Sequence, residues 1–166
     1  HQEGKIDIAK ELYNQVLKIN PENSSVHNNL GFLFTELRDY EKAKSYFEKV
    51  IEIKPDYADA HYNLGEIFRK LKEFEKAKEC YEKVIEIKPD YADAHYNLGV
   101  IFQELKENEK AKSYFEKAIE FDPLNKKYMV GYGYILLRLN DKLKGYEYID
   151  KVEGVIKFTP TYYKII

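Results

Sequence analysis

An all-α solenoid of stacked helical hairpins is the fold class that this sequence predicts, and three observations support it. The segment Tyr57–Asp90 is followed at once by a near-copy, Tyr91–Leu124, in which about two thirds of the 34 positions are identical. Within each copy, apolar residues recur at helical spacing, and a proline closes the copy. Repeats of this period are typical of solenoids, in which each unit buries its apolar face against its neighbours.

Each copy is predicted to form two helices joined by a short turn. The first helix of the central copy shows the i, i+3, i+4, i+7 spacing of a single apolar face, with Leu64, Ile67, Phe68 and Leu71. A polar turn at Lys72–Glu73 precedes a second apolar set, which runs from Phe74 to Ile87. The small residues Gly65 and Ala77 lie on these apolar faces, so they are expected to let the two helix backbones approach closely.

The helix ends are predicted from capping residues and prolines. Asp56 and Asp90 fall where N-caps are expected, with Asp59 and Asp93 three residues later, an arrangement that resembles a capping box. Pro89 is expected to end the second helix, because a proline disfavours helical geometry at the residue before it.

The repeats divide the whole chain, which is predicted to be one solenoid domain over residues 1–166. Gly131 stands where earlier copies have asparagine, and Gly145 stands where they have alanine. Because glycine inside a helix costs about 1 kcal/mol relative to alanine, the fourth hairpin is expected to be the loosest. The predicted units are a half repeat at 1–23, regular repeats at 24–57, 58–91 and 92–125, a degenerate repeat at 126–157, and the start of another helix at 158–166, with Thr159 as its N-cap and Pro160 as its first residue.

These signature positions resemble the tetratricopeptide repeat, a helix–turn–helix unit of this period. The resemblance implies a right-handed superhelix and a protein–protein interaction module. One departure is consistent: histidine stands where the family usually has tryptophan, and we expect these histidines to pack rather than to bind a metal. The matching positions are Leu64, Gly65, Phe68, Ala77, Tyr81, Val84 and Pro89, with their counterparts in the neighbouring copies, and the histidines are His27, His61 and His95.

Composition excludes several classes of function. A net charge of −2 argues against a nucleic-acid or anionic-membrane surface, and no apolar run approaches the length of a membrane span. The single cysteine, Cys80, cannot form an internal disulfide, and a zinc site is not expected. No Gly-rich phosphate loop or other catalytic motif is present. We therefore expect a cytoplasmic protein that is not an enzyme and uses no cofactor.

Three asparagines at one repeat position are the first candidate binding residues: Asn29, Asn63 and Asn97. An asparagine amide can pair with both the N–H and the C=O of a peptide unit. Neighbouring first helices should lie about 10 Å apart, and an extended peptide advances about 3.3 Å per residue. One asparagine is therefore expected to hold the partner's backbone about every third residue. The alternative is that these side chains bridge adjacent repeats.

Residues around this asparagine ladder are expected to complete the surface. Aromatic rings beside carboxylates favour an extended partner segment with apolar and basic side chains. The alternative for the two aspartates is that they only interact favourably with the helix dipole. The set comprises Phe32, Asp59, Tyr62, Glu66, Asp93, Tyr96 and Val100.

Two other functions remain open from the sequence. The tyrosine-rich C-terminal end is expected to mark an interface if the protein associates with itself, because exposed aromatic patches of this kind mark contacts. The chain is alternatively the substrate-recruiting arm of a larger enzyme. The tyrosines in question are Tyr128, Tyr132, Tyr134, Tyr146, Tyr148, Tyr162 and Tyr163.

Overall fold

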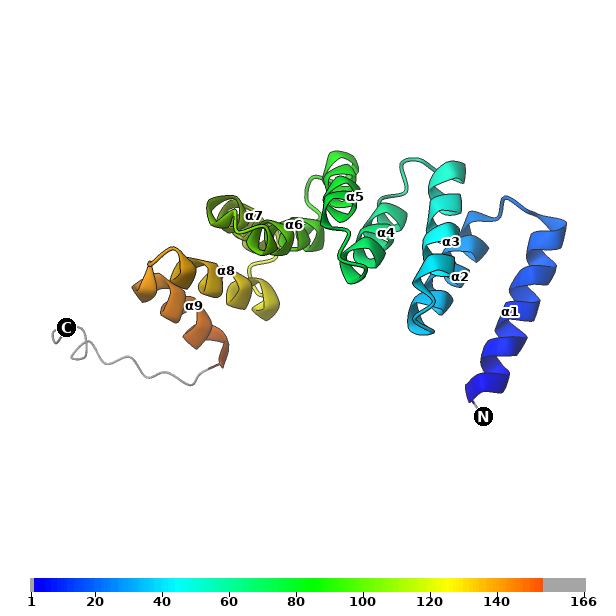
Figure 1. Cartoon of the computed structure of the whole chain (residues 1–166), viewed down its shortest axis with the longest axis horizontal. Helices are drawn as coiled ribbons and strands as arrows, with labels where there is room; N and C mark the ends of the chain where they lie inside the picture. Colours follow the sequence, from blue (N-terminus) through cyan, green and yellow to red (C-terminus); the bar gives the residue numbers. More distant parts are fainter. Residues whose placement is uncertain (1, 154–166) are drawn as a thin grey trace. The chain divides into compact units, whose positions relative to one another are not determined.

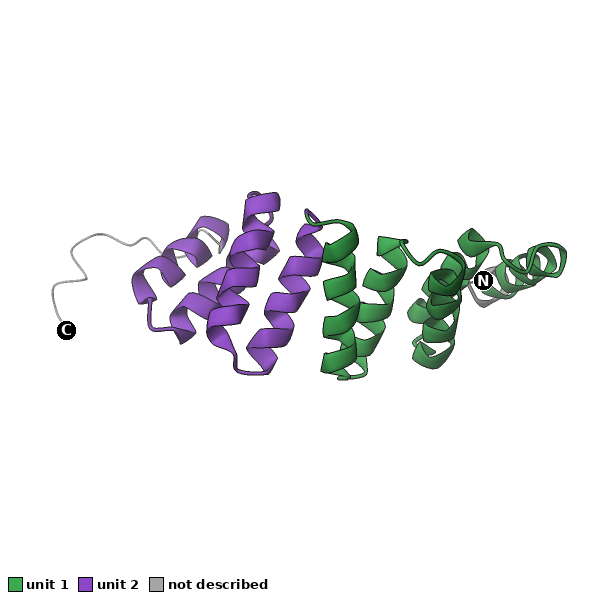
Figure 2. Ribbon diagram, turned by 90° about the horizontal axis from the view of Figure 1, so that it is seen from above, with its two compact units in different colours: residues 1–89 green, residues 90–166 purple. Residues whose placement is uncertain are grey.

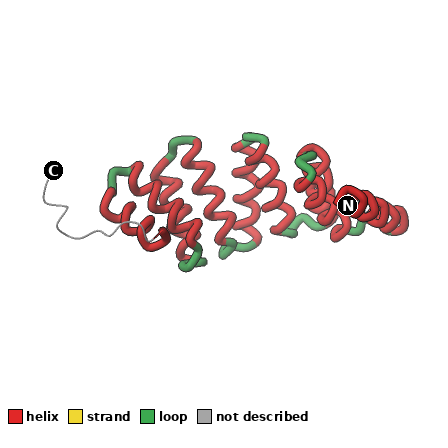
Figure 3. The backbone as a smooth tube through the Cα atoms, turned by 90° about the horizontal axis from the view of Figure 1, so that it is seen from below, coloured by secondary structure: helices red, strands yellow, loops and turns green. Residues whose placement is uncertain are grey.

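A computed structural model describes residues 2–153, and all the regular secondary structure in this range is helical (Figures 1 and 3). None of these helices combines the length and apolar character needed to cross a membrane. The nine helices of the described residues are α1 (Gln2–Ile19), α2 (Ser24–Glu36), α3 (Tyr40–Ile53), α4 (Ala58–Lys70), α5 (Phe74–Ile87), α6 (Ala92–Glu104), α7 (Asn108–Phe121), α8 (Lys126–Arg138) and α9 (Lys142–Glu153).

The helices confirm the predicted all-α solenoid of hairpins. The pairs α2–α3, α4–α5, α6–α7 and α8–α9 each pack as a hairpin, and α1 packs against α2 as a single helix. Residues 158–166, which were expected to begin a further helix, lie outside the described residues, as do Tyr162 and Tyr163.

The chain forms two compact units, shown in different colours in Figure 2. The first unit, residues 1–89, holds α1 to α5, and α3 packs there against α4. The second unit, residues 90–166, holds α6 to α9, and α8 packs there against both α6 and α7. The handedness of a superhelix stays a prediction.

Each hairpin turn contains one residue in the left-handed conformation. In the central turn, the Lys72 N–H donates to the Arg69 carbonyl at 3.0 Å and the Glu73 N–H donates to the Phe68 carbonyl at 2.9 Å. These two bonds form a Schellman motif, which satisfies carbonyls at the end of α4. The motif needs a positive φ, which is 58° at Arg38, 61° at Lys72, 62° at Lys106 and 65° at Asn140.

The small residues predicted to bring the helices together have a defined role in the core. A Cβ at Gly65 would lie 2.8 Å from Cε1 of Tyr81, and one at Gly31 would lie 2.6 Å from Cε1 of Phe47. Each glycine of a first helix therefore makes room for an aromatic ring of its own second helix. The third hairpin repeats this contact with Gly99 and Phe115.

The prediction that Asp56 and Asp90 are N-caps is wrong. The N-cap residues of α4 and α6 are Tyr57 and Tyr91, and neither makes a side-chain capping bond. The cause is the two-residue turn that starts at the preceding proline, which delays the helix by one residue. Side-chain caps occur instead where asparagine holds the same repeat position, at Asn23 for α2 and Asn125 for α8. The predicted end at Pro89 is confirmed, since α5 ends at Ile87 and Lys88 is extended.

In the fourth hairpin, α8 and α9 approach each other through two glycines and not through a glycine and an aromatic ring. A Cβ at Gly145 would lie 2.7 Å from Cδ2 of Leu137 and 2.9 Å from the carbonyl oxygen of Gly133. The two glycines thus face each other's backbone across α8 and α9. That this hairpin is the loosest stays a prediction.

Replacing Lys72 by glycine is expected to raise the free energy of unfolding by about 0.5–1 kcal/mol, because a residue with a Cβ pays about 1–2 kcal/mol for left-handed geometry. Urea unfolding followed by circular dichroism measures the change. The control is Glu79→Gly in the exposed middle of α5, which should lose about 1 kcal/mol. A loss for Lys72→Gly would contradict the assigned turn geometry.

Replacing Gly145 by alanine is expected to destabilise the protein although alanine is the better helix former. Overpacking costs about 1–3 kcal/mol, whereas helix propensity returns about 1 kcal/mol. The same urea experiment measures the net loss, with the exposed Ser113→Ala in α7 as a control for propensity alone. An increase in the free energy of unfolding would contradict the prediction, because it would show that α8 and α9 leave room for a methyl group at residue 145.

Candidate functional site

The three ladder asparagines occupy one repeat position but differ in their environments. Asn29 of α2 is exposed and Asn63 of α4 is half-buried, and both belong to the first unit. Asn97 of α6, in the second unit, is buried, with 3 % of its surface exposed. Two of the three side chains are therefore open to a ligand, and the third is enclosed.

The first unit has a groove between its first helices, which we call the α2–α4 groove. It encloses about 150 Å³, and Asn63 forms part of its wall. Phe32 is 46 % exposed at its edge and meets the buried Phe47 ring edge-on at 5.6 Å. The lining residues are Phe32, Thr35, Phe47, Asn63, Glu66, Ile67 and Lys70.

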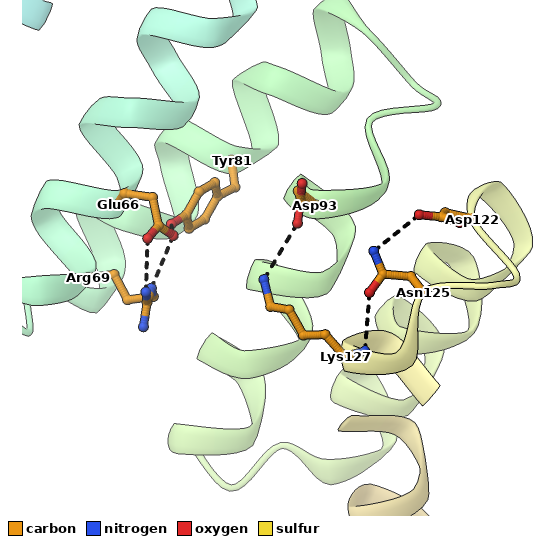
Figure 4. A network of polar contacts seen from close by, with 7 residues as sticks. All are labelled: Glu66, Arg69, Tyr81, Asp93, Asp122, Asn125 and Lys127. Carbon is orange, nitrogen blue, oxygen red and sulfur yellow. Dashed lines mark hydrogen bonds and ion pairs between the residues drawn. The ribbon is translucent and has the colours of Figure 1, made fainter. Parts of the chain in front are cut away.

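Glu66 of this groove is the centre of a polar network (Figure 4). Arg69 donates to both of its carboxylate oxygens, at 3.2 and 2.9 Å, and the Tyr81 hydroxyl donates to Oε1 at 2.6 Å. Burial, and then the adjacent Glu66 charge, raise the pKa of Tyr81 above its ordinary value. Hydrogen bonding to Glu66 raises the pKa of Arg69 in turn. The carboxylate expected to meet a basic partner thus binds groups of its own hairpin.

The two aspartates of the candidate set each have a lysine partner. Asp59, in the first turn of α4, lies 3.7 Å from Lys88 Nζ. Asp93, in the first turn of α6, lies 3.5 Å from Lys127 Nζ, as drawn in Figure 4. Their position suits the favourable interaction with the helix dipole. Both pairs are largely solvent-exposed, and such pairs contribute about 0–1 kcal/mol.

The second unit has a larger groove between its first helices, which we call the α6–α8 groove. It encloses about 590 Å³. Two residues of the candidate set, Tyr96 and Val100, line it, and Gly131 stands at the ladder position. Its lining residues are Tyr96, Val100, Gln103, Phe115, Val130, Gly131, Tyr134, Leu137 and Arg138.

Tyr62 and Tyr96 hold equivalent places in the two units. Tyr62 packs against Tyr81 with ring centroids 5.7 Å apart. Tyr96 contacts Phe115 at 5.3 Å and stacks on Tyr128 at 5.2 Å. The two tyrosines are therefore parts of aromatic clusters.

Sequence reasoning missed most residues of the α6–α8 groove. Val130, Tyr134, Leu137 and Arg138 belong to the degenerate repeat, where the family signature is weak. A usable signal was present, because Tyr134 lies one period after Val100 and two periods after Glu66. The glycine at the ladder position, Gly131, was a second signal.

The histidines in place of tryptophan do more than pack. His27 Nε2 lies 2.7 Å from the Pro21 carbonyl, and His61 Nε2 lies 2.8 Å from the Pro55 carbonyl. With Nε2 protonated, each ring donates to the proline that precedes its hairpin. Within residues 2–153, no group of three or more His, Cys, Asp or Glu residues is placed to hold a metal ion.

Cys80 is buried in α5. Burial, followed by the charges of Glu79 and Glu48, raises the pKa of its thiol to about 12. The thiol is therefore protonated at neutral pH, whereas the thiolate is the nucleophilic form.

Most of the described tyrosines of the C-terminal end pack inside the second unit. Tyr128 and Tyr132 are buried, and Tyr132 meets the Tyr148 ring edge-on at 4.8 Å. Tyr132 also donates to Glu116 at 2.5 Å. Tyr134 is 50 % exposed and points to the groove rather than to a separate patch. Self-association through this end stays a prediction.

Replacing His61 by phenylalanine keeps a ring and removes its hydrogen bond, so it should cost about 1 kcal/mol of stability. His27→Phe removes the equivalent bond to the Pro21 carbonyl, so a similar cost is expected. Urea midpoints measure both changes. Unchanged midpoints for both variants would show that ring packing alone decides this position.

Family models described as TPR repeat or tetratricopeptide repeat match much of the sequence. The matches cover residues 1–23, 24–57, 46–79, 65–106 and 92–125, and together they span residues 1–125. A search of curated proteins gives no significant match.

Solved structures also share this fold. A crystal structure of MamA is 25% identical with a TM-score of 0.83, over 92% of this chain and 90% of that chain. PilF of Pseudomonas aeruginosa is 20% identical with a TM-score of 0.82, over 96% of this chain and 73% of that one. YrrB, described as a TPR protein with an unusual peptide-binding site, is 20% identical with a TM-score of 0.75, over 86% of this chain and 75% of its own.

Proposed function

This chain belongs to the tetratricopeptide repeat family and is a protein–protein interaction module, and we propose that it binds an extended peptide segment of a partner along the first helices of its hairpins. The observation that carries the proposal is the recurrence of a groove between first helices at one repeat position, in each unit separately. YrrB, which has this fold, is described as having a peptide-binding site. We infer that the chain acts by binding and not by catalysis.

The asparagine ladder supplies the contacts to the partner's backbone. Asn29 is exposed and Asn63 lines the α2–α4 groove, so both amides are accessible to a peptide. Each amide offers a donor and an acceptor to one peptide unit. Because every peptide has these backbone groups, the contribution of the ladder is nearly independent of the partner's side chains.

Asn97 has a different part in this proposal. At 3 % exposure its amide reaches a peptide only after neighbouring side chains move. The bridging role that the sequence left open therefore suits Asn97 better than Asn29. The ladder combines two ligand contacts with one structural asparagine.

Side chains around the ladder select the partner. Phe32 offers an exposed aromatic edge for apolar residues. A basic residue of the partner would displace Lys88 from Asp59 at little cost, because exposed ion pairs contribute about 0–1 kcal/mol. Glu66 is a poorer choice for such a residue, since Arg69 and Tyr81 already hold its two oxygens.

The test uses peptides selected from a random twelve-residue library displayed on phage and panned against the full chain. Changing Asn29 and Asn63 together to alanine removes up to four hydrogen bonds of about 1 kcal/mol each, so it should weaken binding by about 2–4 kcal/mol. Fluorescence anisotropy with labelled peptides measures the loss. The melting temperature should stay within a degree or two of wild type, because alanine is the better helix former.

Two controls separate a binding role from a structural one. Asn14→Ala, an exposed asparagine of α1, should change neither affinity nor stability. Asn97→Ala should lower the melting temperature, because a buried polar contact is lost. The proposal fails if the double variant binds the selected peptides as tightly as wild type does.

A further inference from the structure

The α6–α8 groove differs from the α2–α4 groove in size and in chemistry. It encloses about 590 Å³ against about 150 Å³. Its volume falls in the range of about 300–1,000 Å³ that is usual for ligand pockets. The linings differ at several equivalent positions, with Val100 in place of Phe32, Gly131 in place of Asn63 and Tyr134 in place of Glu66. Phe115 lines this groove as its counterpart Phe47 lines the smaller one. The Tyr96 ring packs against Gly131, with Cε2 2.9 Å from where a Cβ would lie.

The walls of this groove are held in place by their own contacts. Phe115 is fully buried, and Tyr96 packs against it with ring centroids 5.3 Å apart. Tyr96 also stacks on Tyr128 at 5.2 Å, and Lys127 Nζ lies 4.3 Å from the centre of its ring. A pocket with fixed walls costs little to organise when a ligand enters. The groove is thus preformed on the side of α6.

In the part of the chain that the structure describes, the lining combines apolar surface with an arginine that forms no ion pair. Val100, Val130 and Leu137 line it, and Tyr134 is 50 % exposed at its edge. Among residues 2–153, none that lines the groove is a carboxylate. Arg138, at the last position of α8, is exposed and has no ion-pair partner among residues 2–153. In the α2–α4 groove, by contrast, Glu66 is paired with Arg69.

We propose that the α6–α8 groove binds a large apolar side chain of the partner peptide, aromatic or leucine-like, and that Arg138 pairs with an acidic residue beside it. This inference rests on the peptide binding proposed above and names the residues that the second unit selects. Charge complementarity decides the acidic residue, since a guanidinium forms two parallel hydrogen bonds to a carboxylate.

The spacing of the two selected residues follows from the helix. Tyr134 and Arg138 lie one turn apart on α8, which is about 6 Å along its axis. An extended peptide covers this distance in about two residues, at about 3.3 Å each. The acidic residue is therefore expected within about three residues of the apolar one.

The first experiment pans a random twelve-residue phage library against the full chain and against three variants of it. The wild-type chain should enrich peptides that carry an aromatic residue or leucine close to Asp or Glu. Arg138→Glu should replace the acidic preference by a basic one and keep the apolar residue. Gly131→Asn, which restores the ladder residue, should remove the preference for an apolar residue. Tyr134→Gln should weaken the same preference. Because Tyr134 is exposed, this change should not affect folding.

The second experiment measures the affinity of one enriched peptide, labelled with fluorescein, by anisotropy. Arg138→Glu should weaken binding about 10-fold or more, because a hydrogen bond to a charged group is lost and like charges then meet. Lys126→Glu is the matched control, with the same charge change at the exposed first position of the same helix. It should change affinity less than about twofold. Circular dichroism melts of all variants verify that they are folded.

The outcomes separate this inference from the proposed function. If enriched peptides respond to the Asn29 and Asn63 double variant but not to Arg138→Glu or Tyr134→Gln, the α6–α8 inference is overturned and peptide binding stands. Enriched peptides with a basic residue in place of the acidic one would also overturn it. If no peptide is enriched over a blocked surface without protein, both proposals fall.

Discussion

The fit of an aromatic ring against a glycine is the contact on which each regular hairpin depends. Gly65 has no side chain because the Tyr81 ring occupies that space, 2.8 Å from where a Cβ would lie. The same pair recurs as Gly31 with Phe47 and as Gly99 with Phe115. The ring is fully buried, so it fixes both the separation and the register of the two helices. Because the contact is local, the three regular hairpins are shaped in the same way before they meet a neighbour.

This shared core leaves the exposed side of the first helices free to vary. The residue after the glycine is Phe32 in α2, Glu66 in α4, Val100 in α6 and Tyr134 in α8. None of these residues is buried, and each borders a groove. The same framework can therefore present an aromatic edge, a paired carboxylate or an apolar wall. In our proposal, fold and recognition therefore reside in different residues of one helix, as is general for sites carried on a common fold.

Periodicity was enough to predict the helices but not the environments of their polar residues. The apolar spacing and Pro89 placed α4 and α5 correctly, because local patterns determine those elements. The caps were misplaced by one residue, since the turn before Tyr57 depends on backbone geometry that composition does not reveal. Tyr81 and Glu66 are 15 residues apart and lie on different helices, so the spacing of residues within one helix could not predict their hydrogen bond. The three ladder asparagines occupy the same repeat position, so the sequence could not show that Asn97 is the buried one among them.

In the degenerate repeat, residues that depart from the family signature have structural roles of their own. Gly131 replaces an asparagine inside α8, at a cost of a few tenths of a kcal/mol in helix propensity. The same change lets the Tyr96 ring pack against α8, with Cε2 2.9 Å from where a Cβ of residue 131 would lie, and Gly131 lines the α6–α8 groove. Gly145 likewise looks like a lost alanine, yet its Cβ would collide with Leu137 and with the Gly133 carbonyl. Local rules fail here because tertiary contacts, and in our proposal the binding surface, act on the same residues, and functional sites are expected to depart from consensus in this way.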